Sequence, residues 1–294
     1  MDKLVIEVRM NEAARKAANP HVPYTPDEIV ADALACAEAG AAIVHFHARN
    51  ADGSESNETD DYRQILRGIR AHSDVLIHPT LGRFRGDAGR EERLGHVRAL
   101  CEEGLAPDVA PLDMGSNNVD LFDPHAREFR GEGFVYANST ANLREMAGRL
   151  RQWGVRPQHA IWSVPNLRLM GAFVAAWLAP EPAFCTLFLA GPGFLGGHPA
   201  TEAGLRAYVD NLPDVRTVWS AMCVGGEMFD LLPQVIAAGG HVSLGLGDDP
   251  YASLGQPSNA EIVQEVVRIA RDEGREVASP ADARRLFAME HQPA

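Results

Sequence analysis

Hydrophobic and polar positions follow two alternating periods along the whole chain. Short runs rich in Val, Ile, Leu and Ala alternate with longer stretches in which apolar residues recur at the spacing of one helix face. This alternation is typical of successive parallel βα units. The short runs predict eight strands, at 4–9, 42–47, 75–80, 108–114, 158–163, 184–189, 217–222 and 241–246. Eight such units predict an α/β fold of the (β/α)8 TIM barrel type.

Capping signals mark where two of the helices begin. Thr25 and Glu28 form a capping box with a proline at the first helical position, and Gly40 is placed to end that helix. Ser258 and Glu261 repeat the box before an apolar stretch. We therefore expect one helix after the first strand and another after the last.

The length of the chain fits one barrel domain. Its 294 residues, 46% of them hydrophobic, can bury a large core without a second domain. We expect a single domain over 1–294, with a C-terminal helical segment at about 258–290. A loop at about 113–140, after the fourth strand, is long for a βα connection and suits a lid or an oligomer contact.

Charge and composition favour a small-molecule substrate. The chain has 27 Lys and Arg against 40 Asp and Glu, a net charge of -13 that opposes binding to nucleic acid or to an anionic membrane. The N-terminus enters a strand at once, and no apolar run approaches membrane-spanning length, so we expect a cytoplasmic protein. The 4 cysteines are scattered and predict neither disulfides nor a zinc ribbon.

The second predicted strand ends in a His-x-His pair, His45 and His47. Residues i and i+2 of a strand share a face, so the two imidazoles converge. Two imidazoles, a carboxylate and a water make a catalytic divalent-metal site. The alternative is a pair that is hydrogen-bonded by backbone and nearby carboxylates, and the spacing leaves both open.

Lysine usage narrows the chemistry. Only Lys3 and Lys16 occur, and neither can lie near the end of a late strand. Schiff-base and pyridoxal phosphate enzymes need a buried lysine amine, so the sequence disfavours both classes. A metal would then have to polarise any substrate carbonyl.

Further polar residues follow the predicted strands, where a barrel carries its chemistry. Asp248 is a candidate base or metal-shell carboxylate. Glu227 follows the seventh strand, and its simpler interpretation is an acidic residue in the first turn of a helix, where the helix dipole favours it. The other strand-end candidates are Asn11, Glu12, His78, Thr80, Asp113, Ser116, Asn117 and Ser243.

A glycine-rich loop at 191–196 matches G-x-G-x-x-G, the pattern of dinucleotide-binding proteins. We reject that interpretation because the glycines do not open a helix directly and lie in the sixth unit. A loop whose backbone approaches a ligand phosphate or carboxylate, and a loop without ligand contact, both remain open.

Three motifs together resemble those of the β-keto acid cleavage enzymes, typified by 3-keto-5-aminohexanoate cleavage enzyme: Glu-Ala-Gly-Ala-Ala-Ile-Val-His-Phe-His-Ala-Arg at 38–49, Gly-Gly-His-Val at 239–242 and Gly-Arg-Glu-Val-Ala at 274–278. The resemblance covers nearly the whole chain. It implies a zinc-dependent barrel that condenses a β-keto acid with acetyl-CoA and splits the adduct into acetoacetate and a new acyl-CoA. It also favours a homo-oligomer, with a tetramer as the expected form.

The resemblance implies roles for individual residues. His45 and His47 match the zinc histidines of the family. Thr80 and Ser116 fall where the family places hydroxyl groups around the substrate. Asp248 matches the final catalytic aspartate.

Three positions depart from the family pattern. Ser243 replaces an arginine and becomes a candidate for substrate binding, while Ala160 replaces a glutamate of the fifth strand. Gly247 replaces the glutamate that is the third zinc ligand. Glu12 matches a family glutamate that lines the pocket, and because the first strand lies between the eighth and the second, we expect it to be the replacement ligand, ahead of Asp248 and a glutamate of the seventh loop.

Two alternatives to a β-keto acid cleavage enzyme follow from the same residues. One is a metal-dependent hydrolase of the amidohydrolase type, although that superfamily places its His-x-His pair on the first strand. The other is a catalytically weakened, ligand-binding relative that kept the barrel but lost the arginine and glutamate at Ser243 and Gly247.

Overall fold

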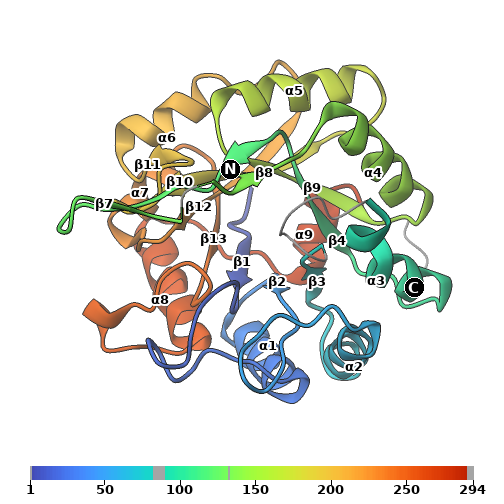
Figure 1. The fold of residues 1–294 in the computed structure, drawn as a ribbon, viewed down its shortest axis with the longest axis horizontal. Coiled ribbons are helices and arrows are strands. Elements are labelled where there is room, and N and C mark those ends of the chain that lie inside the picture. Colours follow the sequence, from blue (N-terminus) through green and yellow to red (C-terminus); the bar gives the residue numbers. More distant parts are fainter. Residues whose placement is uncertain (1, 82–89, 132, 290–294) are drawn as a thin grey trace.

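Eight parallel strands form a nearly closed barrel in the computed structural model, which describes residues 2–81, 90–131 and 133–289 (Figure 1). The strands neighbour one another in the order β3, β2, β1, β13, β12, β10, β9, β4. They are β1 (Ile6–Arg9), β2 (Ile43–Phe46), β3 (Leu76–Pro79), β4 (Val109–Asp113), β9 (Arg156–Ile161), β10 (Ala183–Ala190), β12 (Thr217–Val224) and β13 (His241–Leu244). The predicted TIM barrel is confirmed.

Helices surround the barrel as an outer ring, apart from the last one, which lies behind the centre of the barrel in the view of Figure 1. The capping boxes at Thr25 and Ser258 both form, and Gly40 ends the first helix with φ of 118°. The helices are α1 (Pro26–Ala39), α2 (Thr59–Arg70), α3 (Arg90–Glu102), α4 (Thr140–Gln152), α5 (Val164–Ala175), α6 (Glu202–Val209), α7 (Leu232–Ala237), α8 (Asn259–Asp272) and α9 (Pro280–Leu286), with short 3-10 turns at η1 (Phe229–Leu231) and η2 (Ala252–Leu254).

Asp108 joins the two strands at the ends of this order. Its backbone N–H donates to the Ile77 carbonyl at 3.0 Å, and its carboxylate accepts from the Ile77 N–H at 2.9 Å. Arg284 of α9 donates to the same carboxylate at 2.9 Å, and Phe287 stacks on Phe184 at the start of β10, with ring centroids 4.1 Å apart. The segment that contains α9 therefore covers the N-terminal end of the barrel and braces the gap between β3 and β4.

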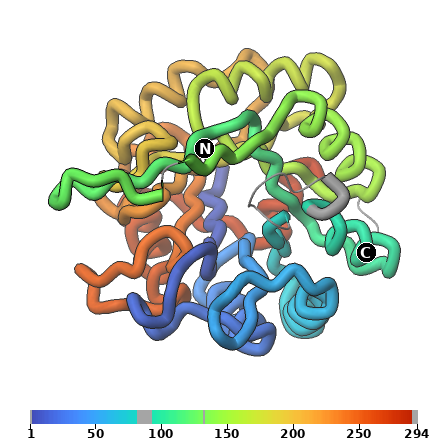
Figure 2. The backbone as a smooth tube through the Cα atoms, viewed as in Figure 1, coloured from blue at the N-terminus to red at the C-terminus, as the bar shows by residue number. Residues whose placement is uncertain are grey.

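The segment between β4 and α4 forms two small antiparallel ribbons. β5 (Asn117–Asn118) pairs with β8 (Val135–Tyr136), and β6 (Leu121–Asp123) pairs with β7 (Glu128–Arg130). The second ribbon projects from the body of the molecule, as Figure 2 shows, while a further short strand, β11 (His198–Pro199), pairs with β10. The long βα connection thus has structure of its own and returns Tyr136 to the barrel.

Most strand boundaries differ by one or two residues from the sequence prediction, and two of the differences have a clear local cause. β9 begins two residues before the predicted 158–163, because Arg156 already pairs with Val109 of β4, and Ser163 becomes the N-cap of α5. β13 ends at Leu244, before the predicted end at 246, because the backbone N–H of Leu246 donates to the side chain of Asn259 at 2.9 Å. In the described ranges, no helix has both the length and the apolar character needed to cross a membrane.

We expect Asn259→Ala to lower the free energy of unfolding by about 2 to 4 kcal/mol, since it strands buried backbone groups. Besides Leu246, the fully buried Asn259 amide reaches the carbonyl of Met10 at 3.0 Å and the carboxylate of Asp32 at 2.7 Å. Urea unfolding followed by circular dichroism measures the change. Asn211→Ala, at an exposed helix end, is the control, and equal effects of the two substitutions would contradict the prediction.

Candidate metal centre and cavity

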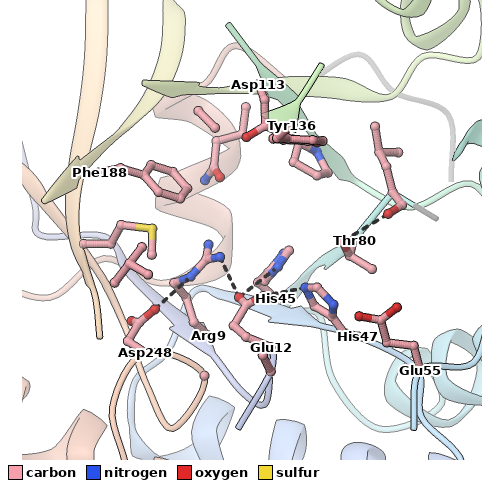
Figure 3. A pocket seen from close by; sticks show the side chains of 18 of the residues that line it. Arg9, Glu12, His45, His47, Glu55, Thr80, Asp113, Tyr136, Phe188 and Asp248 are labelled. Carbon is pink, nitrogen blue, oxygen red and sulfur yellow. Dashed lines mark hydrogen bonds and ion pairs between the residues drawn. The ribbon is translucent and has the colours of Figure 1, made fainter. Parts of the chain in front are cut away.

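A cavity of about 250 Å³ lies at the C-terminal ends of the strands. Figure 3 shows Arg9, Glu12, His45 and His47 along one side of it, and Asp113, Tyr136 and Phe188 on the side opposite. This is the end at which TIM barrels carry their active sites. The residues that sequence reasoning placed after the first and second strands therefore meet at the expected mouth.

Glu12 lies between the two strand-end histidines. Its Oε1 is 3.1 Å from His45 Nε2, and its Oε2 is 2.5 Å from His47 Nε2. One ligand atom from each of the three residues falls within 4.8 Å of the others. The two imidazoles come from the end of β2 and the carboxylate from the loop after β1, its neighbour in the sheet.

Local backbone contacts place Glu12 there. The side chain of Asn11 donates to the His47 carbonyl at 2.8 Å and accepts from the His47 N–H at 2.9 Å, which ties the two loops together. Arg49 donates to the Asn11 carbonyl at 3.0 Å. Glu12 itself adopts the left-handed conformation, with φ of 33°, which is unfavourable for a residue with a side chain. The surrounding contacts therefore hold Glu12 in a strained position, a feature typical of functional sites.

Gly247 provides the space that Glu12 occupies. A Cβ atom at Gly247 would lie only 2.2 Å from Glu12 Cγ and 3.1 Å from the Arg9 carbonyl. The side chain of Glu12 therefore fills the volume that a larger residue at Gly247 would need.

The protonation states of these groups fit a divalent cation. Burial opposes the ionised form of Glu12, but Arg9, His45 and His47 hold its pKa well below the usual range. Burial lowers the pKa of His45 to about 3, even beside Glu12. A carboxylate and a neutral imidazole are the ligating forms of these residues. Two histidines and one carboxylate also match the donor set of catalytic zinc sites.

A second buried carboxylate, Glu7, lies deeper in the barrel. Its Oε1 is 2.6 Å from His78 Nδ1, and its Oε2 accepts from Gln158 at 2.8 Å. Burial would raise the pKa of Glu7, but the charge and hydrogen bond of His78, with His45 and Arg9 nearby, lower it to about 2. The His78 ring in turn contacts the His45 ring edge-on, at a centroid distance of 4.4 Å. Glu7 thus holds His78, the ring against which His45 packs.

Arg9 connects Glu12 to Asp248. Its Nη2 is 2.6 Å from Glu12 Oε1, and its Nε is 3.3 Å from Asp248 Oδ1. Burial raises the pKa of Asp248 well above the usual range despite Arg9, and the negative charge of Glu12 adds to the effect. Asp248 Oδ2 is buried and has no hydrogen-bond partner among the described residues. A carboxyl group of this kind beside a cavity is suited to accept and return a proton.

Aromatic side chains surround Asp113 on the opposite wall. Tyr136 donates its hydroxyl hydrogen to Asp113 Oδ2 at 2.8 Å, and the Trp162 indole donates to Oδ1 at 2.7 Å. Arg93 of α3 donates to the Tyr136 hydroxyl and to Asn138. The sequence prediction included Asp113 as a strand-end candidate but missed Tyr136 and Trp162. Spacing along the sequence cannot predict that a loop of this length brings Tyr136 back to the cavity.

The remaining predicted site residues differ in position. Thr80 lines the cavity, and its hydroxyl donates to the Leu81 carbonyl. The Ser116 hydroxyl instead accepts from the Asn138 N–H at 2.8 Å, outside the set of cavity-lining residues. Ser243 is fully buried inside the barrel, opposite Glu7 in the strand register, and does not line the cavity. The roles of Thr80, Ser116 and Ser243 in substrate binding stay predictions.

A second hollow lies beside the first, over the ends of β10 and β12. Its volume is about 730 Å³, and it is lined by the glycine-rich loop after β10 and by Glu227, whose carboxylate accepts from Ser253 at 3.2 Å. Glu227 therefore lies outside the Glu12, His45 and His47 set. The loop glycines end before α6 begins at Glu202, so they do not open a helix as a dinucleotide site requires.

Comparison with known proteins shows the family of the chain. The family model "beta-keto acid cleavage enzyme" matches residues 3–289. A "3-keto-5-aminohexanoate cleavage enzyme" of Acetoanaerobium sticklandii is 29% identical over 293 residues, which cover 98% of this chain and 99% of that protein. A "3-dehydrocarnitine:acetyl-CoA trimethylamine transferase" of Rhizobium meliloti is 31% identical, covering 92% of this chain and 90% of that protein.

Solved structures agree on the architecture. The ternary complex of ObcA with a C4-CoA adduct and oxalate matches with a TM-score of 0.70 and 17% identity, over 92% of this chain and 68% of that one. The fold and site define a TIM-barrel enzyme with its polar centre at the strand ends. The chain belongs to the beta-keto acid cleavage enzyme family.

We expect Gly247→Ala to weaken divalent-cation binding by at least about tenfold, because the added methyl group displaces Glu12 from the histidines. Titration of the chelator-treated protein with Co²⁺, followed by its visible absorption, measures both affinity and ligand set. Gly148→Ala, where a Cβ meets nothing within 4 Å, is the control. Unchanged cobalt affinity in Gly247→Ala would contradict the prediction.

The contribution of the buried Glu7 and His78 pair to stability should depend on pH. The pKa of Glu7 is lowered from 4.5 to about 2, so its stabilising effect is present above pH 4.5 and is lost as the pH falls toward 2. The stability difference between the wild-type protein and Glu7→Gln should therefore shrink by about 2 kcal/mol between pH 6 and pH 3. Urea unfolding of metal-free protein measures it. The exposed Glu273→Gln is the control, and a pH-independent Glu7→Gln difference would refute the prediction.

Proposed function

We propose that this chain is a zinc-dependent β-keto acid cleavage enzyme that condenses a β-keto acid with acetyl-CoA and releases acetoacetate and a new acyl-CoA. The set of Glu12, His45 and His47 at the cavity mouth, in a chain of this family, is the observation that carries the proposal. Relatives named as acetyl-CoA transferases, at 30% and 31% identity, support the use of acetyl-CoA. Family membership also favours this activity over that of an amidohydrolase.

Glu12, His45 and His47 would hold the zinc ion. Bound there, zinc would polarise the keto oxygen and stabilise negative charge as it develops on the substrate. The guanidinium of Arg9 lines the same cavity and would attract the substrate carboxylate. Because Arg9 is already fixed by Glu12 and Asp248, it needs little reorganisation to do so.

Asp248 would move the proton. The α-carbon, which lies between the keto and carboxylate groups, gives its proton to Asp248 Oδ2, and the electron pair left behind forms a bond to the acetyl carbonyl carbon of acetyl-CoA. The bond from that acetyl carbon to the CoA sulfur breaks, and the sulfur forms a bond to the original keto carbon. The bond between the keto carbon and the α-carbon then breaks: its electron pair stays on the α-carbon, which takes the proton back from Asp248 to give acetoacetate, and the keto carbon leaves as the carbonyl of the new acyl-CoA. The raised pKa of Asp248 suits both proton transfers.

The second hollow is suited to admit the thioester. It adjoins the cavity at β12, where Val224 lines the cavity and Gly225 lines the hollow. Glycines in its walls let a ligand approach the backbone closely. We include the loops after β10 and β12 in the proposal as the path by which acetyl-CoA reaches the substrate.

The decisive assay combines purified protein, acetyl-CoA and a panel of β-keto acids and measures acetoacetate enzymatically. We expect chelation to abolish activity and zinc to restore it, and Glu12→Gln to lower kcat/KM by at least about 100-fold together with zinc content. The exposed His72→Ala is the control for a histidine outside the site. Absence of acetoacetate from every acid, with zinc bound, would reject the proposed function.

A further inference from the structure

The cavity wall opposite the Glu12, His45 and His47 set consists of aromatic rings around one carboxylate. We define the Asp113 wall as Asp113, Tyr136, Trp162 and Phe188, all of which line the cavity. Figure 3 shows Asp113, Tyr136 and Phe188 on the opposite side of the cavity from the Glu12, His45 and His47 set. A substrate held by its keto acid end near Glu12 would therefore present its side chain to the Asp113 wall.

In the part of the chain that the structure describes, Asp113 is hydrogen-bonded by neutral groups and is not paired with a cation. Its two oxygens accept hydrogen bonds from the Trp162 indole and the Tyr136 hydroxyl, which are neutral donors. Within the described residues Asp113 forms no ion pair, and Arg93 reaches the Tyr136 hydroxyl instead. Arg9 is the one arginine or lysine among the described lining residues, and it is already paired with Glu12 and Asp248. A buried carboxylate in this position attracts a cation.

The rings of the wall are suited to the same charge. Trp162 and Phe188 pack with their centroids 4.1 Å apart, and the Arg9 guanidinium already lies 5.6 Å from the Phe188 centroid. Proteins bind alkylated ammonium groups on aromatic faces, and a nearby carboxylate adds an opposite charge. Such a group needs no hydrogen-bond acceptor, and both Asp113 oxygens already accept a hydrogen bond.

From this arrangement we propose that the enzyme selects β-keto acids whose side chain ends in a compact quaternary or otherwise alkylated ammonium group. The inference rests on the proposed function and adds the side-chain class of its substrate. A cavity of about 250 Å³ favours a short side chain. A carboxylate-bearing side chain is disfavoured, because it would face the Asp113 carboxylate, and the described lining residues offer no unpaired cation on that wall.

A pair of substrates of equal shape tests the charge alone. 4-Trimethylammonio-3-oxobutanoate and the neutral analogue in which carbon replaces the quaternary nitrogen differ only in that charge. We expect the zinc-loaded protein to bind the cation at least about tenfold more tightly by isothermal titration calorimetry without acetyl-CoA. With acetyl-CoA, the ratio of the two kcat/KM values should follow, and 3-oxoadipate should be the poorest substrate.

Two substitutions test which residues cause the preference for the cation over the neutral analogue. Asp113→Asn and Phe188→Leu should each reduce the cation-to-neutral affinity ratio by at least about fivefold, since one removes the charge and the other the ring. The ratio is the readout because a general loss of fold lowers both affinities together. Trp177→Leu, at a side chain that is 85% exposed, should leave it unchanged.

The binding and turnover outcomes separate the two proposals. If the cation binds no more tightly than the neutral analogue, the inference is overturned, even where both acids yield acetoacetate. If the cation binds more tightly and Asp113→Asn removes the preference, the inference stands, even where no acid yields acetoacetate and the proposed function falls.

Discussion

The contact between the Glu12 carboxylate and two strand-end histidines organises this barrel mouth. Without Glu12, His45 and His47 would be two imidazoles at the end of β2, and Arg9 would lose the partner that aims its guanidinium across the cavity. The contact itself depends on two features of backbone: the left-handed turn at Glu12 and the missing side chain at Gly247. The charge arrangement at the cavity mouth therefore depends on the backbone conformation of the two loops that contain Glu12 and Gly247.

Adjacency of strands explains how the site departs from the family pattern. The resemblance leads one to expect an arginine at Ser243 and a glutamate at Gly247, both on or after β13. β1 pairs directly with β13, and Arg9 and Glu12 extend from its end. A guanidinium and a carboxylate therefore still reach the cavity, and in this chain the side chain of Glu12 occupies the volume that a side chain at Gly247 would need, since a Cβ there would lie 2.2 Å from Glu12 Cγ.

Hydrophobic periodicity was sufficient to predict the barrel, while the family resemblance and the strand order of a closed barrel led to the prediction of Glu12 beside the histidines. These features follow from local patterns and from the neighbour relation that a closed parallel sheet imposes. The same reasoning could not locate Tyr136, because its position depends on two ribbons within a long connection. It also could not tell that Ser243 sits a layer too deep to line the cavity, since depth in a barrel depends on strand tilt and register.

The bracing of β3 and β4 by Asp108 has a consequence for synthesis of the chain. Arg284, which holds the Asp108 carboxylate, belongs to the last helix described, and the Phe287 ring covers the base of the barrel. A ribosome delivers these groups only after all eight strands have emerged. The nascent barrel thus stays open along one side and at its base until the residues of α9 have left the ribosome, and its completion follows the synthesis of every strand, whatever the order in which the strands pair.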